Sequence, residues 1–360
     1  MDTRVQEERL KDWYKAMKNW DKEEAARHKT AFETDEELED KPEIHKLSRL
    51  LTARFHLMNQ ELDLAASVLA ESVPEEDEDG RLTYFYHFFH GIYEYQQRNY
   101  SEAIDHYLKA EPIIKTKNNP EELAEFSYKL ASAYHRTYNV VLSIEYAEQA
   151  LRIFRNRSHY VRMAHCENLI ALNYQEIKHY KETERHLRSA WLYAARIRDE
   201  EVKRMILHNF GYFYSQQNDP KTALVYLMQA YELIESDAGL LKIQNLYLSA
   251  ENHFKMGQKV KAASVLDEAL ILARDFGHEG YACRCDMLRA KYMEPSSFEE
   301  TYKTGIRYFH ERERWEIVND ASKELGAFYQ EKGRYQEACF YYDLSITARD
   351  KIDQALSYYQ

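Results

Sequence analysis

The chain has 360 residues and carries 49 lysines and arginines against 61 aspartates and glutamates, a net charge of −12 at pH 7. Hydrophobic residues make up 44%, enough for a sizeable core, while 31% charged residues and a mean hydropathy of −0.72 indicate a polar surface. The acidic balance argues against direct contact with nucleic acid. With 10 glycines and 6 prolines, the chain also has too few turn residues for a β-sandwich or β-barrel.

The termini and cysteines indicate a cytoplasmic protein that needs no cofactor. The N-terminus lacks the apolar segment of a signal peptide, and no stretch approaches the roughly 18 apolar residues of a membrane span. The four cysteines suit reduced thiols, and Cys283 and Cys285 have no second pair nearby to complete a zinc site. His87 and His90 lie beside phenylalanines and are expected to pack rather than bind metal. We expect neither a metal site nor a membrane contact.

The first third of the chain divides into helices and an acidic segment. Residues 5–29 predict one helix, and the apolar spacing in residues 43–71 predicts two helices or one long bent helix. The segment SVPEEDEDGR at 72–81 combines proline, glycine and five acids, which is typical of an exposed linker and a possible hinge. We therefore expect an N-terminal bundle at 1–71, a linker at 72–81 and a second domain at 82–360.

A repeat of about 40 residues fills the second domain. A small residue recurs in steps of 40, 40, 40, 39 and 76, the last being two periods of 38 with a degenerate unit around Thr301. These residues are Ala103, Ser143, Thr183, Ala223, Ala262 and Ala338. A second set lies on the preceding helix: Gly91, Ala131, Ala171, Gly211, Ala250 and Gly326. Small residues let two helices approach closely, as in tetratricopeptide repeats. The predicted fold is all-α: an N-terminal three-helix bundle followed by a right-handed superhelix of about seven tetratricopeptide-like repeats.

Three segments carry a family resemblance. They are KDWYKAMKNWDKEEAARHKTAFE (11–33), RLTYFYHFFHGIYEYQQRNYSEAI (81–104) and EELAEFSYKLASAYHRTYNVVLSIEYAEQAL (121–151). They resemble the Rap family of quorum-sensing regulators from Gram-positive bacteria. The resemblance implies that the bundle and linker bind a response regulator, which some members dephosphorylate and others block from DNA. It also implies that a short Phr peptide of about five residues binds the concave groove of the repeats and releases the target.

One position bears on phosphatase activity. Phosphatase members of the family present a glutamine in the second bundle helix, and an ungapped alignment of IHKLSRLLTARFHLM (44–58) places Arg49 there. A carboxamide can accept and donate while orienting a water, whereas a guanidinium only donates. The next glutamine, Gln60, lies eleven residues later. The alignment favours a protein without phosphatase activity, although a two-residue slip would reverse this. Arg49 and Arg54 are the expected target-binding residues.

The first helix of each repeat should present a polar face to the concave side. The candidate peptide-binding residues there are Asn168, Gln175, Glu176, Asn209, Tyr212, Gln216, Tyr247, Glu251, Phe254 and Asp286. An amide can satisfy both groups of a peptide unit, and a carboxylate can hold an ammonium or a basic side chain. By resemblance, Asn209 matches the asparagine that clamps the peptide backbone, and Glu176 stands where the family has a functionally important aspartate. A solvated polar face without a ligand would show the same pattern.

Four functions remain open from the sequence. The favoured one is a regulator that sequesters a transcription regulator, either a response regulator or a mobile-element repressor, and releases it when the peptide binds. The alternative is a phosphatase of a response regulator of the sporulation phosphorelay type. A peptide-sensing transcription factor would need a basic helix-turn-helix, and residues 1–70 offer no basic run longer than Arg27-His28-Lys29. A co-chaperone scaffold is the fourth.

The aromatic C-terminal end predicts a homodimer, because a terminal repeat normally has a polar outer face. Its aromatic residues are Phe328, Tyr329, Tyr341, Tyr342, Tyr358 and Tyr359.

Overall fold

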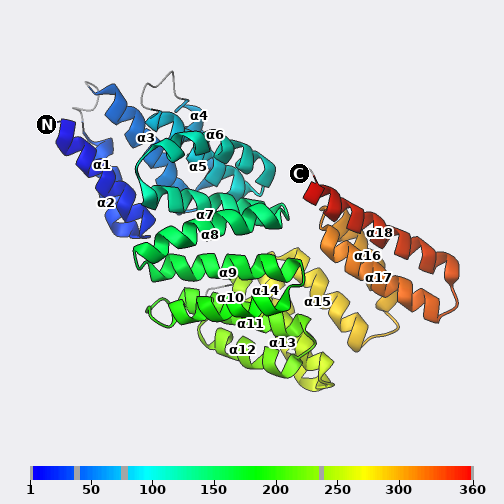
Figure 1. Ribbon diagram of the computed structural model, residues 1–360. Helices are drawn as coiled ribbons and strands as arrows, with labels where there is room; N and C mark the ends of the chain where they lie inside the picture. Colours follow the sequence, from blue (N-terminus) through cyan, green and yellow to red (C-terminus); the bar gives the residue numbers. More distant parts are fainter. Residues whose placement is uncertain (1–2, 36–40, 74–79, 235–238, 358–360) are drawn as a thin grey trace. The chain divides into compact units, whose positions relative to one another are not determined.

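Every regular element of the described chain is an α-helix. The computed structural model describes residues 3–35, 41–73, 80–234 and 239–357 (Figure 1). Its helices are α1 (Thr3–Lys18), α2 (Lys22–Glu33), α3 (Pro42–Met58), α4 (Leu62–Ala70), α5 (Arg81–Gln97), α6 (Tyr100–Thr116), α7 (Pro120–Arg136), α8 (Val140–Asn156), α9 (Tyr160–Glu176), α10 (Tyr180–Ala194), α11 (Glu200–Gln216), α12 (Pro220–Glu232), α13 (Gly239–Lys255), α14 (Lys259–Asp275), α15 (Glu279–Tyr292), α16 (Phe298–His310), α17 (Trp315–Glu331) and α18 (Tyr335–Ser357). Within these ranges no helix is long and apolar enough to cross a bilayer. The predicted all-α class is confirmed.

The N-terminal segment contains one helix more than predicted. Over residues 3–73, as far as they are described, it forms α1 to α4. The single helix predicted over 5–29 is wrong because the backbone turns at Trp20, which has a left-handed φ of 59°, and Asp21 then caps α2 by accepting from the Glu24 N–H at 3.0 Å. For residues 43–71, where two helices or one long bent helix were predicted, the structure has two helices with left-handed Gln60 (φ 62°) between them.

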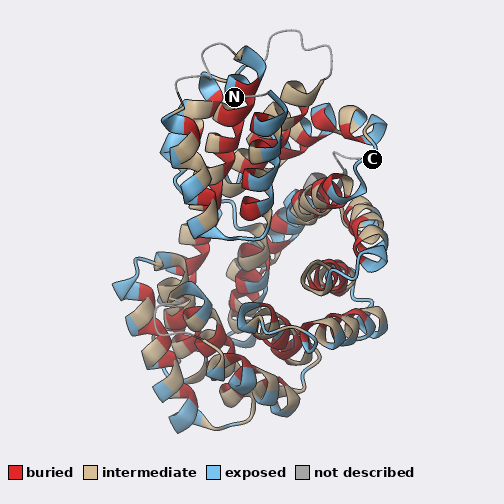
Figure 2. Cartoon of the chain, turned by 90° about the vertical axis from the view of Figure 1, so that its left-hand side faces the viewer, coloured by how far each residue is buried: buried red, intermediate tan, exposed pale blue. Residues whose placement is uncertain are grey.

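Seven helix pairs follow in the described residues 80–234 and 239–357, from α5/α6 to α17/α18. The small residues lie where the two helices of a pair cross. A Cβ added to Gly211 on α11 would lie 2.5 Å from Cγ of Leu227 on α12, and one on Gly326 would lie 2.9 Å from the Tyr342 ring. In the degenerate pair α15/α16 the second helix supplies the glycine, because Gly305 faces Met287. Close approach at the crossings buries one side of each helix and leaves the other exposed (Figure 2).

The helices group into two compact units. Unit 1 contains Met1–Thr137 and Val141–Ile153, and unit 2 contains Tyr138–Val140 and Phe154–Gln360. The first two repeats belong to unit 1 because they pack on the N-terminal helices. Glu122 of α7, 3% exposed, accepts hydrogen bonds from Tyr14 of α1 at 2.6 Å and Tyr84 of α5 at 2.9 Å. Lys18 lies 3.5 Å from the same carboxylate. The boundary predicted at 72–81 stays a prediction, and residues 74–79 lie outside the described ranges.

The aromatic residues near the C-terminus pack largely against one another. Tyr329 is fully buried and stacks on Tyr341 at 5.6 Å, and Phe328 lies 4.9 Å from the Phe298 ring. The exposed rings in the described part of α18 are instead Tyr335 and Phe340, with 68% and 62% of their surface open. Tyr358 and Tyr359 lie outside the described residues. The homodimer stays a prediction.

Candidate functional site

Five helices of unit 2 bring polar side chains around the hydroxyl group of Tyr212 on α11. Burial raises the pKa of Tyr212 to about 12, and the charges of Glu176 (α9), Glu251 (α13) and Asp320 (α17) raise it further, while Arg284 (α15) opposes them. The effect of a charge on a pKa weakens with distance, so these side chains lie in the neighbourhood of the Tyr212 hydroxyl. The Tyr212 ring is nevertheless 37% exposed. The first helices of five successive repeats therefore border one solvent-open space, which we call the inner lane.

Two asparagines join neighbouring repeats in this lane. Asn209 on α11 donates through Nδ2 to Oδ1 of Asn168 on α9 at 2.8 Å, and Asn168 in turn points its own Nδ2 at the Met205 sulfur, 3.9 Å away. Asn168 is buried, whereas Asn209 is half-buried. Among the described residues the Asn209 Oδ1 has no hydrogen-bond partner. One amide is thus held in place with an acceptor and a second N–H still available for a ligand.

Glu176 at the end of α9 is an unpaired carboxylate. Its side chain is exposed, and no lysine or arginine of the described chain lies within ion-pair distance of it. Although the residue as a whole is exposed, protein packed near its carboxylate partly desolvates it and raises its pKa. By contrast, Glu251 is paired with Lys255 at 2.9 Å. Glu176 is therefore the carboxylate of the inner lane that can pair with an incoming cation.

The other predicted lane residues differ in how far they are buried. Gln216 is exposed and Tyr247 half-buried. Gln175 is 8% exposed, and both polar atoms of its amide are buried without a hydrogen-bond partner in the described structure. Phe254 lies elsewhere than predicted. It is 4% exposed and stacks on Tyr292 at 4.7 Å, so it belongs to the core between repeats.

Asp286 is also placed differently from the prediction. Its carboxylate lies 3.8 Å from Arg274 of α14. The residue that α15 contributes to the lane is Arg284, which the sequence reading missed. A signal for it exists: Arg284 is the sixth residue of its helix, as Asp320 is in α17. Counting from the helix start would have selected it, but the irregular sequence of this repeat hid that start.

The two arginines predicted to bind the target are both engaged inside unit 1. Arg49 on α3 donates to Glu71, which ends α4, at 2.5 Å. Arg54 is 8% exposed, and its charge acts on the buried hydroxyl groups of Tyr14 and Tyr107. A buried Arg54 cannot contact a partner without local opening, so its predicted role does not fit this structure.

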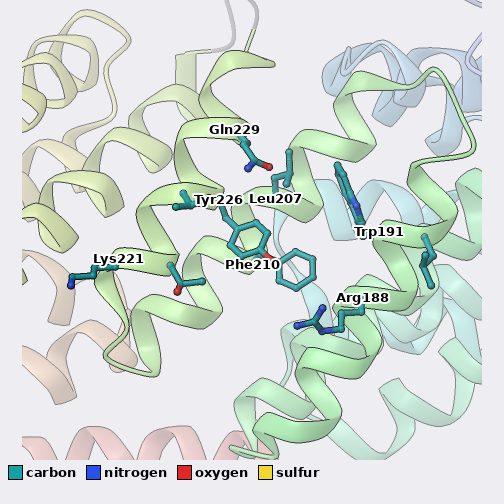
Figure 3. Close-up of a pocket in the computed structure, with 10 residues that line it drawn as sticks. Arg188, Trp191, Leu207, Phe210, Lys221, Tyr226 and Gln229 are labelled. Atoms are coloured by element: carbon teal, nitrogen blue, oxygen red, sulfur yellow. The ribbon is translucent and has the colours of Figure 1, made fainter.

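A second hollow lies between α10, α11 and α12. It encloses about 710 Å³ and is lined by the rings of Trp191, Phe210 and Tyr226, the last two stacked at 4.7 Å (Figure 3). Arg188 at its edge is already paired with Glu184 at 2.6 Å. The inner lane is the stronger candidate because it collects several polar groups from different repeats, which is typical of ligand sites.

Similarity to known proteins covers almost the entire chain, although no protein-family model matches it. The chain is 23% identical to the regulatory protein RapF of Bacillus subtilis (strain 168), over 98% of this chain and 96% of RapF. It is 25% identical to the response regulator aspartate phosphatase H of the same organism, over 96% and 94%. The predicted resemblance to the Rap family is confirmed.

Solved Rap structures share the fold. A Rap protein crystallised with competence and sporulation factor superposes with a TM-score of 0.83 at 23% identity, over 98% of this chain and 100% of that one. The Rap conjugation gene regulator of plasmid pLS20, in complex with the Phr* peptide, gives 0.68 at 22% identity, over 98% and 97%. Helical repeats on the pattern of the Rap proteins therefore describe this chain as well.

Proposed function

We propose that the chain is a peptide-responsive regulator. A short peptide of about five residues binds the inner lane of unit 2, and a transcription regulator bound through the N-terminal helices is then released. The transcription regulator is a response regulator or a mobile-element repressor. The observation that carries this proposal is the Asn168–Asn209 pair beside the unpaired Glu176. The Phr* complex of the pLS20 Rap regulator supports it, since that structure shares the fold.

The chemistry of the lane suits an extended peptide. Such a peptide must satisfy its backbone N–H and C=O groups when it leaves water. The oriented amide of Asn209 can accept from one peptide N–H and donate to a C=O, because only one of its N–H groups is used by Asn168. Glu176 can hold the peptide's ammonium group or a basic side chain. Together these groups set both the backbone position and the charge of the ligand.

The first experiment is a pull-down of the protein from its own host lysate, with and without the small exported peptides of that host. Capture of a DNA-binding protein that one peptide releases would support the proposal. Release requires the peptide to prefer the target-free conformation, since equal affinity for both states shifts nothing.

Asn209→Ala tests the site itself. Loss of a backbone clamp should weaken binding of the releasing peptide about tenfold, which corresponds to roughly 1.4 kcal/mol. Gln229→Ala, which removes an amide from the edge of the hollow beside α12, is the matched control and should leave the affinity unchanged. Equal affinities of wild type and Asn209→Ala in isothermal titration calorimetry would remove Asn209 from the site.

A phosphatase is the second candidate, because several relatives are response regulator aspartate phosphatases. We infer binding without hydrolysis, since Arg49 is an arginine held by Glu71 rather than a free carboxamide. The purified protein should leave the decay of a phosphorylated response regulator at its intrinsic rate. Acceleration well above that rate would replace the sequestering mechanism by the phosphatase one.

A further inference from the structure

Arg284 is held between two tyrosine rings in the inner lane. Its guanidinium carbon lies 4.3 Å from the ring centre of Tyr247 on α13 and 5.1 Å from that of Tyr281 on its own helix. The two rings stand edge to face, 6.2 Å apart and at 72° to each other. Two aromatic faces stabilise and orient a guanidinium while leaving its N–H edges available for hydrogen bonds.

This guanidinium has no carboxylate partner. Across the described ranges no aspartate or glutamate lies within ion-pair distance of Arg284. The nearby Glu251 is paired with Lys255 at 2.9 Å. Other arginines of the same repeats do have partners: Arg274 lies near Asp286, and Arg289 pairs with Asp267. A cation enclosed by protein and left unpaired is costly, and an arriving anion removes that cost.

The lane also holds charges of both signs. Besides burial, Glu176, Glu251 and Asp320 raise the pKa of Tyr212, whereas Arg284 lowers it. Glu176 can therefore receive a cation and Arg284 an anion. A short peptide with free termini carries both charges, and a guanidinium can hold a carboxylate through two parallel hydrogen bonds.

We propose that Arg284, fixed by Tyr247 and Tyr281, is the carboxylate receptor of the inner lane and selects peptides that present a carboxylate there. The carboxylate is the C-terminus of the peptide or an acidic side chain, and Glu176 receives the positive group. This inference rests on the proposed function, because it assigns chemistry to the same site.

The probe is a synthetic library of pentapeptides with free C-termini, enriched on the purified full-length protein and identified by mass spectrometry. The selected peptide is then titrated into wild type, Arg284→Gln and Arg312→Gln. Arg312 is the matched control because its guanidinium lies 3.8 Å from the Tyr308 ring centre but stands outside the lane. Thermal unfolding of each variant checks that it folds.

We expect Arg284→Gln to weaken binding at least tenfold and Arg312→Gln to leave it unchanged. Neutralising the carboxylate on the peptide should weaken wild-type binding equally and should not weaken Arg284→Gln further, since the two changes remove one interaction. Amidation of the C-terminus that produces this effect identifies the terminal carboxylate, and a Glu-to-Gln or Asp-to-Asn peptide that produces it identifies a side chain. If Arg284→Gln fails to fold, the affinities of the neutralised peptides for wild type alone test whether the lane binds a carboxylate.

Two results would overturn the inference. If the selected peptide binds wild type and Arg284→Gln equally, or if no neutralised peptide loses affinity for wild type, Arg284 is not the receptor, while peptide binding itself stands. If wild type enriches no pentapeptide, the proposed function fails and this inference fails with it.

Discussion

Replacing Gly211 by alanine should destabilise unit 2, even though alanine is the better helix former. The new Cβ would lie 2.5 Å from Cγ of Leu227 and 3.3 Å from the backbone oxygen of Ala223. Ordinary carbon contacts are about 3.5–4.0 Å, so α11 and α12 must separate. Leu227 and Ala223 are fully buried, and the nearest atom of Ala223 belongs to the backbone, which cannot rotate away as the end of a side chain can. An overlap of this size falls in the upper part of the 1–3 kcal/mol cost of overpacking, about 2–3 kcal/mol, and the helix gains about 1 kcal/mol, so we expect a net loss of about 1–2 kcal/mol.

Gly280→Ala on α15 is the matched control. There the nearest atoms to an added Cβ are 3.8 Å away, an ordinary contact. The same change should therefore stabilise the protein by about 0.4–1 kcal/mol through reduced freedom of the unfolded chain. The contrast between these glycines separates packing from helix propensity.

The assay is urea unfolding monitored by hydrogen exchange. Fragments from α11 and α12 report Gly211→Ala, and fragments from α15 report Gly280→Ala. These signals report unit 2 separately from unit 1, so the comparison holds whether or not the two units unfold in one step. Gly211→Ala should also weaken peptide binding, since Asn209 and Tyr212 share α11. A Gly211→Ala protein as stable as wild type would refute the close crossing of these helices.

Two further predictions concern unit 1. Glu122→Ala leaves two buried tyrosine hydroxyls and a lysine without their shared acceptor, and it should cost about 3–5 kcal/mol of stability. The measurement is the hydrogen-exchange protection of α1, α5 and α7. A loss under about 1 kcal/mol would show that the network is solvated. Burial, then the charge of neighbouring His106, lowers the pKa of His87 and of His90 to about 4. Because the unfolded chain then binds protons that the folded chain excludes, the stability of unit 1 should be complete above pH 6.5 and fall as the pH drops towards 4. The measurement is the unfolding free energy between pH 7 and 4, and a flat profile in this window would contradict the burial of these rings.

Repeat periodicity was enough to predict the helix pairs and their crossings. A residue such as Gly211 recurs about every 40 positions because each pair faces the same steric problem at its crossing. Local spacing therefore carries the information. The same logic placed Asn209 and Tyr212 on the polar face of one helix and Glu176 on the polar face of the first helix of the preceding repeat, and the structure brings them to one lane.

Side-chain pairing could not be predicted in this way. Nothing near Arg49 in the sequence indicates Glu71 as its partner, and Phe254 looks like a groove residue until Tyr292 is seen stacked on it. Both partners come from another helix. The break at Trp20 was missed because its apolar spacing continues a helix, while the backbone dihedral that ends it is a local detail.

The sequence by itself thus determined the helical repeats, their number and the polar face of each first helix, because these depend on patterns within about 40 residues. Only the tertiary structure decided which polar groups remain unpaired. It left Glu176 and Arg284 open to a ligand and engaged Arg54 and Asp286 elsewhere. The reason is physical: an ion pair or a stacked ring depends on distances between helices, and those are set by packing far apart in the chain.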